Sequence, residues 1–173
     1  FFEAMGLIQR QRPDMESIFR REIGEGFDSF ARPGAPDPRT DGNSTESNGP
    51  DLSLIEPDDM EESVAAENLV IKANASYFPQ LYALSQRLAV INGGKKLKDV
   101  DIPAGPHHLV HAFRRSMELL EVEVRIKVIL YALFDKFVIK QANSLYDELN
   151  GSLKEAGILP NLKPVHIRPG QSP

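Results

Sequence analysis

Hydrophobic residues at the start of the chain recur with the spacing of a helix. The large apolar residues between positions 1 and 31 are Phe2, Met5, Ile8, Met15, Ile18, Phe19, Ile23, Phe27 and Phe30. Residues three or four positions apart share one face of an α-helix, so this pattern predicts an amphipathic helical segment over 1–31. Pro13 interrupts the pattern and therefore either bends one helix or begins a second one.

Apolar side chains almost disappear in the next stretch, residues 32–50. It consists mainly of Pro, Gly, Ser, Thr, Asn and Asp, and Ala35 is its single apolar residue apart from the prolines. A segment with so little to bury does not fold by itself. The sequence therefore predicts a flexible linker over 32–50.

Helical spacing returns after Asp51 and continues to residue 162. Prolines stand near the expected helix starts, and Asn92-Gly93-Gly94 suits a helix end. We expect helices near 57–77, 79–92, 106–120 and 122–156, the last with a break near Lys136 as an alternative. No stretch alternates with period two. The predicted fold is all-α: an irregular helical bundle over 51–162, an N-terminal helix attached through the linker, and a Pro-rich tail over 163–173.

The segment from Val122 to Ile139 is apolar nearly all round, which is typical of a helix at the centre of a bundle. We therefore predict a core built largely on this helix. The residues predicted to be buried are Phe113, Leu130, Leu133, Phe134, Phe137 and Leu145.

Composition narrows the functional classes. The chain has no cysteine, which excludes disulfides, thiol catalysis and cysteine-based metal centres. No apolar run approaches the roughly 18 residues of a membrane span. The chain begins with Phe1, without a basic segment before an apolar stretch, so we expect a cytoplasmic fragment of a longer protein.

The charge pattern argues against nucleic acid. Residues 72–168 hold fourteen Lys and Arg against nine Asp and Glu, an excess of five bases within a chain of net charge −5. This excess is too diluted with acids for a dedicated nucleic-acid groove. We expect neither nucleic acid nor a membrane as partner.

Metal sites find little support in the sequence. His107 and His111 are four residues apart and share a helix face, but no glutamate stands between them as in zinc-protease motifs, and no third ligand is evident. The acids at 56–62 lack the glycine turn of a calcium loop and suit a solvated helix start instead; they are Glu56, Asp58, Asp59, Glu61 and Glu62. We predict no metal site.

Catalytic and cofactor sites find no better support. Gly93-Gly94-Lys95-Lys96 follows a predicted helix instead of opening one, so it is a poor phosphate cradle. The Arg-x-x-x-Arg pattern of one class of cyclic-dinucleotide site does not occur. No nucleophile, oriented base and pocket can be assembled from the sequence. We predict no catalytic residue and no cofactor.

Several phrases of the chain resemble one protein family. They are DLSLIEPDDMEESVAAENLV (51–70), LYALSQRLAVINGG (81–94), HAFRRSMELLEVEVRIKVILYALFDKFV (111–138) and LYDELNGSLKEAGILPNL (145–162). In this order they resemble the proteobacterial domain-of-unknown-function family numbered 1631, whose members are often labelled "thymidine phosphorylase". The resemblance implies a longer parent protein without an established reaction, and it carries no catalytic residue over to this chain.

The first helix is the most informative functional feature. Its predicted partner-binding residues are Phe2, Met5, Ile8, Ile18, Phe19, Phe27 and Phe30. This face either packs on the chain's own bundle or docks on a second chain, as a protein partner or by self-association, in a helix-in-groove manner. We interpret the chain as a non-catalytic interaction or scaffold module of a larger bacterial regulatory protein. The alternatives are a fragment of an enzyme whose catalytic residues lie outside this chain, and a nucleotide (cyclic-dinucleotide)-linked signalling module.

Overall fold

The computed structural model describes residues 2–31 and 57–163, and every regular element in those two ranges is a helix. The elements are α1 (Phe2–Ala31), α2 (Pro57–Ser76), α3 (Phe78–Ile91), η1 (Asp99–Asp101), α4 (Pro106–Met117), α5 (Val124–Phe137), η2 (Ile139–Gln141) and α6 (Ala142–Glu155). The all-α prediction is confirmed. The predicted linker, residues 51–56 of the predicted bundle, and the predicted tail beyond Lys163 lie outside the described residues.

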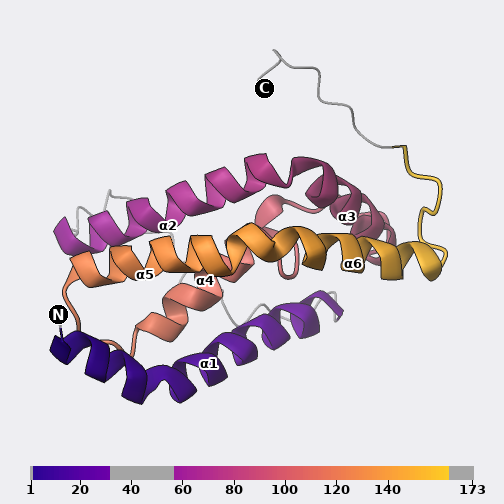
Figure 1. Cartoon of the computed structure of the whole chain (residues 1–173). Coiled ribbons are helices and arrows are strands. Elements are labelled where there is room, and N and C mark those ends of the chain that lie inside the picture. The colour runs from indigo at the N-terminus through magenta and orange to yellow at the C-terminus, as the bar shows by residue number, and fades with distance from the viewer. Residues whose placement is uncertain (1, 32–56, 164–173) are drawn as a thin grey trace, which may run out of the picture.

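Two long, interrupted helices run side by side in the same direction: α2 continued by α3, and α5 continued by α6 (Figure 1). Three side-chain hydrogen bonds between them join residues that are 63 positions apart: Lys72 with Asp135, Gln80 with Asn143, and Arg87 with Asn150. A constant offset means that the two paths advance together, so they are parallel. These bonds fix the register of the pair.

The interruptions of the two long helices meet each other. The first lies at Tyr77, just before Pro79 in the first turn of α3, and the second lies at Val138, before η2. The Tyr77 hydroxyl donates a hydrogen bond of 2.7 Å to the carbonyl oxygen of Ile139. The sequence predicted the first interruption between the helices expected near 57–77 and 79–92. It predicted the second as the alternative break near Lys136.

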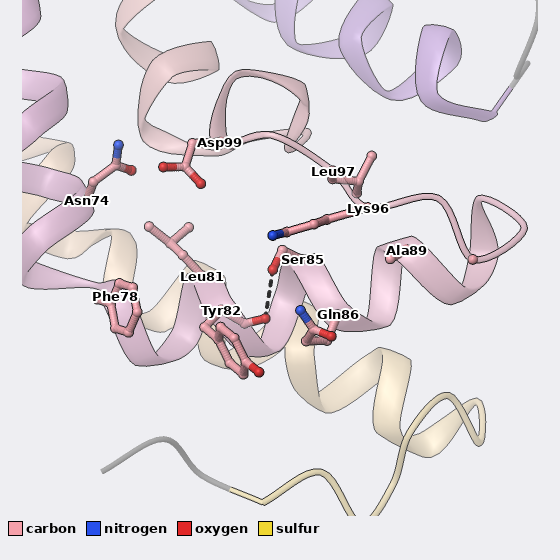
Figure 2. A pocket seen from close by; sticks show the side chains of 11 residues that line it. Asn74, Phe78, Leu81, Tyr82, Ser85, Gln86, Ala89, Lys96, Leu97 and Asp99 are labelled. Carbon is pink, nitrogen blue, oxygen red and sulfur yellow. Dashed lines mark hydrogen bonds between the residues drawn. The ribbon is translucent and has the colours of Figure 1, made fainter. Parts of the chain in front are cut away.

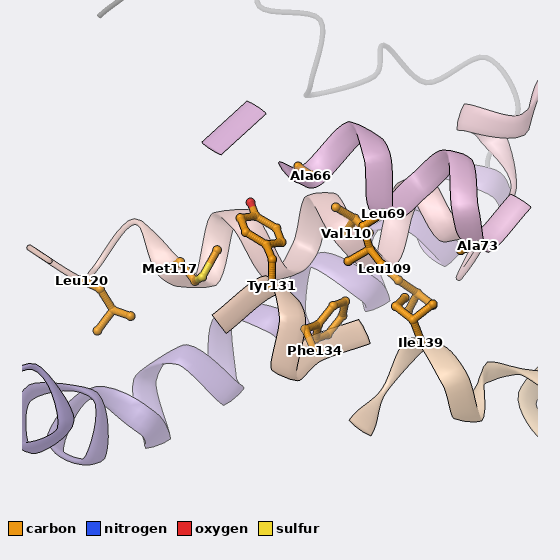
Figure 3. Packing of buried hydrophobic residues seen from close by; sticks show 10 residues of the cluster. All are labelled: Ala66, Leu69, Ala73, Leu109, Val110, Met117, Leu120, Tyr131, Phe134 and Ile139. Atoms are coloured by element: carbon orange, nitrogen blue, oxygen red, sulfur yellow. The ribbon is translucent and has the colours of Figure 1, made fainter. Parts of the chain in front are cut away.

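The principal core lies where α2, α4 and α5 meet (Figure 3). Its buried side chains are Ala66, Leu69, Ala73, Leu109, Val110, Met117, Leu120, Tyr131, Phe134 and Ile139. A second cluster joins α3 to α6 around the fully buried Tyr146, whose hydroxyl donates to the carbonyl oxygen of Ala104 at 3.2 Å. The bundle thus has two cores, one on each side of the interruptions.

The core prediction was correct only in part. Phe134 is buried, and Phe113, Leu130 and Leu145 are half-buried. Leu133 and Phe137 are 44% and 58% exposed, so predicting them as buried was wrong. The reason is the position of α5, which packs on α2 and over the core but leaves its remaining flank uncovered. Although α5 carries apolar residues on nearly all of its faces, it is therefore not enclosed at the centre of the bundle.

A buried acid joins three helices. Glu62 is only 5% exposed, and its carboxylate accepts a hydrogen bond from Lys127 Nζ at 2.8 Å and lies 3.7 Å from Arg114 Nε. The Tyr131 hydroxyl donates to the same carboxylate at 3.3 Å. The interpretation of Glu62 as a solvated acid of a helix start was wrong, because Glu62 lies four residues before Ala66, on the inward face of α2.

Candidate functional site

The first helix packs on its own chain along α4 (Figure 1). It remains one continuous helix through Pro13, and its axis bends, so the proline bends the helix without dividing it. The residues of α1 that pack against the principal core are Leu7, Ile8, Met15, Phe19 and Ile23, while Phe30 packs against the second cluster. The inward face follows the spacing that predicted the helix.

A histidine holds α1 at one defined point. His108 of α4 is 5% exposed, and its Nδ1 accepts a hydrogen bond of 2.9 Å from the backbone N–H of Ala104. The proton therefore sits on Nε2, which donates to the carbonyl oxygen of Glu22 at 3.0 Å. At Gly26 an added Cβ would overlap the His108 ring, so only glycine lets the ring approach the helix this closely.

The seven residues predicted to bind a partner differ in their exposure. Ile8, Phe19 and Phe30 pack inward. Ile18 is half-exposed. Phe2, Met5 and Phe27 are 91%, 43% and 39% exposed. One part of the predicted surface is therefore used within the chain, while the other part faces outward at the two ends of α1.

An apolar groove opens between α1 and α5. It has a volume of about 260 Å³, and its walls are formed mainly by Ile8, Met15, Phe19, Phe113, Phe134 and Val138. The rings of Phe113 and Phe134 stack at 4.1 Å, and Phe19 meets Phe134 edge-on at 6.0 Å. The three packed rings give the groove a firm apolar floor.

Charged side chains of α1 stand at the edge of this groove. Arg12 donates to Glu16 at 2.8 Å, and Arg20 lies 3.9 Å from the same carboxylate. The side chains of Arg12 and Arg20 are 75% and 81% exposed, so water screens these contacts and they contribute little stability. With two bases and one acid, this edge carries a net positive charge.

Two exposed apolar side chains of α5 are next in sequence to residues of the groove. Leu133 and Phe137 are four residues apart on α5. Each precedes a groove residue: Phe134 within the helix, and Val138 just after its end. The Lys136 ammonium lies 5.1 Å above the Phe137 ring, which adds another base beside this apolar surface. We call the groove together with Leu133 and Phe137 the groove surface. Sequence reasoning missed it, although a helix that is apolar all round carries more apolar residues than one core can bury.

Sequence comparison identifies the family. Residues 1–157 match the family described as "Protein of unknown function (DUF1631) N-terminal domain". The chain belongs to the DUF1631 family. No curated protein and no solved structure matches the chain. The family description gives no function, so the surfaces of the DUF1631 domain itself carry the information about its role.

The other candidate sites do not assemble among the described residues of the DUF1631 domain. His107 and His111 stack at 6.4 Å on α4, and the described residues contain no group of three or more His, Asp or Glu that could hold a metal ion. The Gly94 amide closes the end of α3 by donating to the carbonyl oxygen of Ala89, so it is not available to hold a phosphate. None of the helices that the structure describes is long and apolar enough to cross a membrane.

Proposed function

We propose that the DUF1631 N-terminal domain is a non-catalytic interaction module whose groove surface receives a helix of another protein chain. The observation that carries the proposal is the open apolar groove with a floor of three packed phenylalanine rings. Leu133 and Phe137 continue it outward, so a ligand helix would find a continuous apolar strip. Soluble proteins that expose such strips commonly use them to bind a partner.

The charges beside the groove surface favour one kind of helix. Arg12 and Arg20 outnumber Glu16 among the charged residues that line the groove, and Lys136 adds a base beside Phe137, so an incoming helix would gain from acids that flank its apolar stripe. Such charges contribute mainly to orientation and to the rate of association, because exposed pairs are weak. We therefore propose an amphipathic, acid-flanked helix as the occupant.

The outer face of α2 has this character, which makes a second copy of the chain the first occupant to test. Met60, Val64 and Ile71 are 61%, 49% and 61% exposed. Their spacing of four and seven residues puts them on one stripe, and Glu61 and Glu67 are exposed beside it. The groove surface and this stripe are different patches, so the contact would be heterologous.

Sedimentation velocity over a wide dilution series tests this occupant. We expect the average mass of the chain to rise with concentration. Phe137→Glu should suppress the rise by placing a charge on the apolar strip, and Arg20→Glu should weaken it. The matched controls are Val90→Glu, at a similarly exposed site on α3, and Arg21→Glu, next to Arg20 in sequence but not lining the groove. If all of these variants associate to the same extent, the proposal of self-association through this surface is wrong. If the wild-type chain stays monomeric at every concentration, a second copy is excluded and the occupant must be a helix of another protein.

A further inference from the structure

A second cleft lies away from the groove surface, between α3 and the segment from Gly94 to Asp99 (Figure 2). Its volume is about 510 Å³, within the range of small-molecule sites. Polar side chains enter it from both walls: Ser85 and Gln86 from α3, Lys96 and Asp99 from the segment, and Asn74 from α2. The cleft therefore mixes polar groups with the apolar side of α3.

Four of these five polar side chains are not committed to the protein, while the Ser85 hydroxyl donates to the carbonyl oxygen of Tyr82 at 2.8 Å. Among residues 2–31 and 57–163, the side chains of Asn74, Gln86, Lys96 and Asp99 have no hydrogen-bond or ion-pair partner. Lys96 and Asp99 carry opposite charges and line one cleft, yet they do not pair with each other. A ligand with both a positive or N–H group and a negative group could use both side chains.

Two aromatic rings border the same cleft. Phe78 and Tyr82 lie one helical turn apart on α3, and their rings stack at a centroid distance of 6.3 Å with an interplanar angle of 29°. They are 44% and 38% exposed, so their outer faces are open to a flat ring. Stacking on such faces is favourable for any planar aromatic group.

The anion-binding element would be a side chain, not the backbone. Gly94 uses its amide to close α3, as described above. Lys95 N–H donates to the carbonyl oxygen of Asn92. In Figure 2 the Lys96 side chain reaches over α3, and its ammonium group points into the cleft near Ser85 and Leu81. Lys96 is therefore the group placed to meet an anion.

We propose that this cleft binds a small, planar aromatic compound that carries an amino group and an anionic group. The ring lies against Tyr82 and Phe78, the anion meets Lys96, and the amino group donates to Asp99. The stretch of α3 from Phe78 to Ala89 spans about 16 Å at 1.5 Å per residue, enough for a mononucleotide. An aminated aromatic carboxylate offers the same chemistry in a smaller compound.

Titration of the isotope-labelled full chain, followed by amide chemical shifts, tests the site. The probes are adenosine 5′-monophosphate, adenosine, ribose 5-phosphate and 4-aminobenzoate. Adenosine 5′-monophosphate and 4-aminobenzoate are the complete compounds, because each carries the ring, the amino group and the anion. With these two we expect saturable shifts at the amides of Tyr82, Gln86, Lys96 and Leu97. Binding of adenosine and ribose 5-phosphate should be at least about tenfold weaker, because each lacks one of the required groups. Binding of only one complete compound identifies the source of the anion as phosphate or carboxylate.

Paired variants make the result specific. Lys96→Gln should weaken binding of the anionic probes by about tenfold or more and leave adenosine unchanged. Lys95→Gln, at the neighbouring exposed lysine that does not line the cleft, should leave all probes unchanged. The proposal is overturned if neither complete compound gives saturable shifts at these amides, or if the two lysine variants weaken binding equally.

Discussion

Glu62 illustrates how one side chain can depart from the pattern around it. The sequence shows a run of acids at a helix start, and this composition suggested solvation. Its position on the helix makes Glu62 buried instead. It lies on the stripe of α2 that continues through Ala66, Leu69 and Ala73, so it points inward. The spacing contained this information, and the acidic character of the run obscured it.

Replacing this acid should cost stability. Glu62→Gln removes the ion pairs to Lys127 and Arg114, which are themselves partly exposed and can recover some hydration. We therefore expect a loss of about 1–3 kcal/mol in the free energy of unfolding, below the cost of stranding a fully buried charge. Glu61→Gln is the matched control at the adjacent exposed position and should change stability by less than about 0.5 kcal/mol. Urea denaturation measures both, and equal effects would contradict the buried role of Glu62.

Tyr131 should make the fold sensitive to alkali. Burial, together with the nearby Glu62 carboxylate, raises the pKa of Tyr131 above its ordinary value of 10.0. As pH rises past that value the unfolded chain loses this proton first, so the stability contribution present below pH 10 is lost above it. Above pH 10, the free energy of unfolding of Tyr131→Phe should fall less steeply than that of the wild type, by up to about 1.4 kcal/mol per pH unit. Urea denaturation of both proteins below and above pH 10 measures this difference. If the free energy of unfolding declines in parallel for the two proteins, the hydroxyl is not buried.

At the scale of elements, helix ends were predictable because their causes are local. Pro79 and Pro106 lie in the first turns of α3 and α4, and Asn92-Gly93-Gly94 closes α3 with positive φ values of 67° and 83° at the two glycines. The packing partners were less predictable. α5 is apolar nearly all round, yet one flank of it is uncovered because its neighbours are set by long-range contacts. Periodicity gives the faces of a helix but not what covers each face.

The docking of α1 depends on an approach that sequence alone did not indicate. Gly24 and Gly26 both lie near the end of α1, yet only Gly26 faces the His108 ring. Gly26→Ala should destabilise the protein, because the ring or the helix must move. Gly24→Ala, with nothing within 4 Å of the added carbon, should stabilise it by about 0.5–1 kcal/mol through better helix propensity. Thermal denaturation of the two variants checks this, and shifts of the same sign would refute the close contact.

At the scale of the whole molecule, α1 is both part of the body and one wall of the groove surface. The sequence offered self-packing and partner docking as alternatives for this helix. The inward residues Ile8 and Phe19 pack on the core and at the same time line the groove, so the two uses coexist on one helix. Sequence reasoning could not find the groove, because it forms between segments separated by more than a hundred residues.

Site-specific photo-crosslinking tests most directly whether the groove surface binds a helix. A benzophenone analogue of phenylalanine at Phe137 keeps the aromatic character of this 58% exposed position, and the same residue at Val90, which is 50% exposed, is the control. We expect a discrete adduct from Phe137 alone, mapped by mass spectrometry to an acid-flanked apolar stripe on α2 of a second copy or on a helix of another protein. Arg20→Glu should reduce it. No adduct at Phe137, or the same adducts from both positions, would contradict the account.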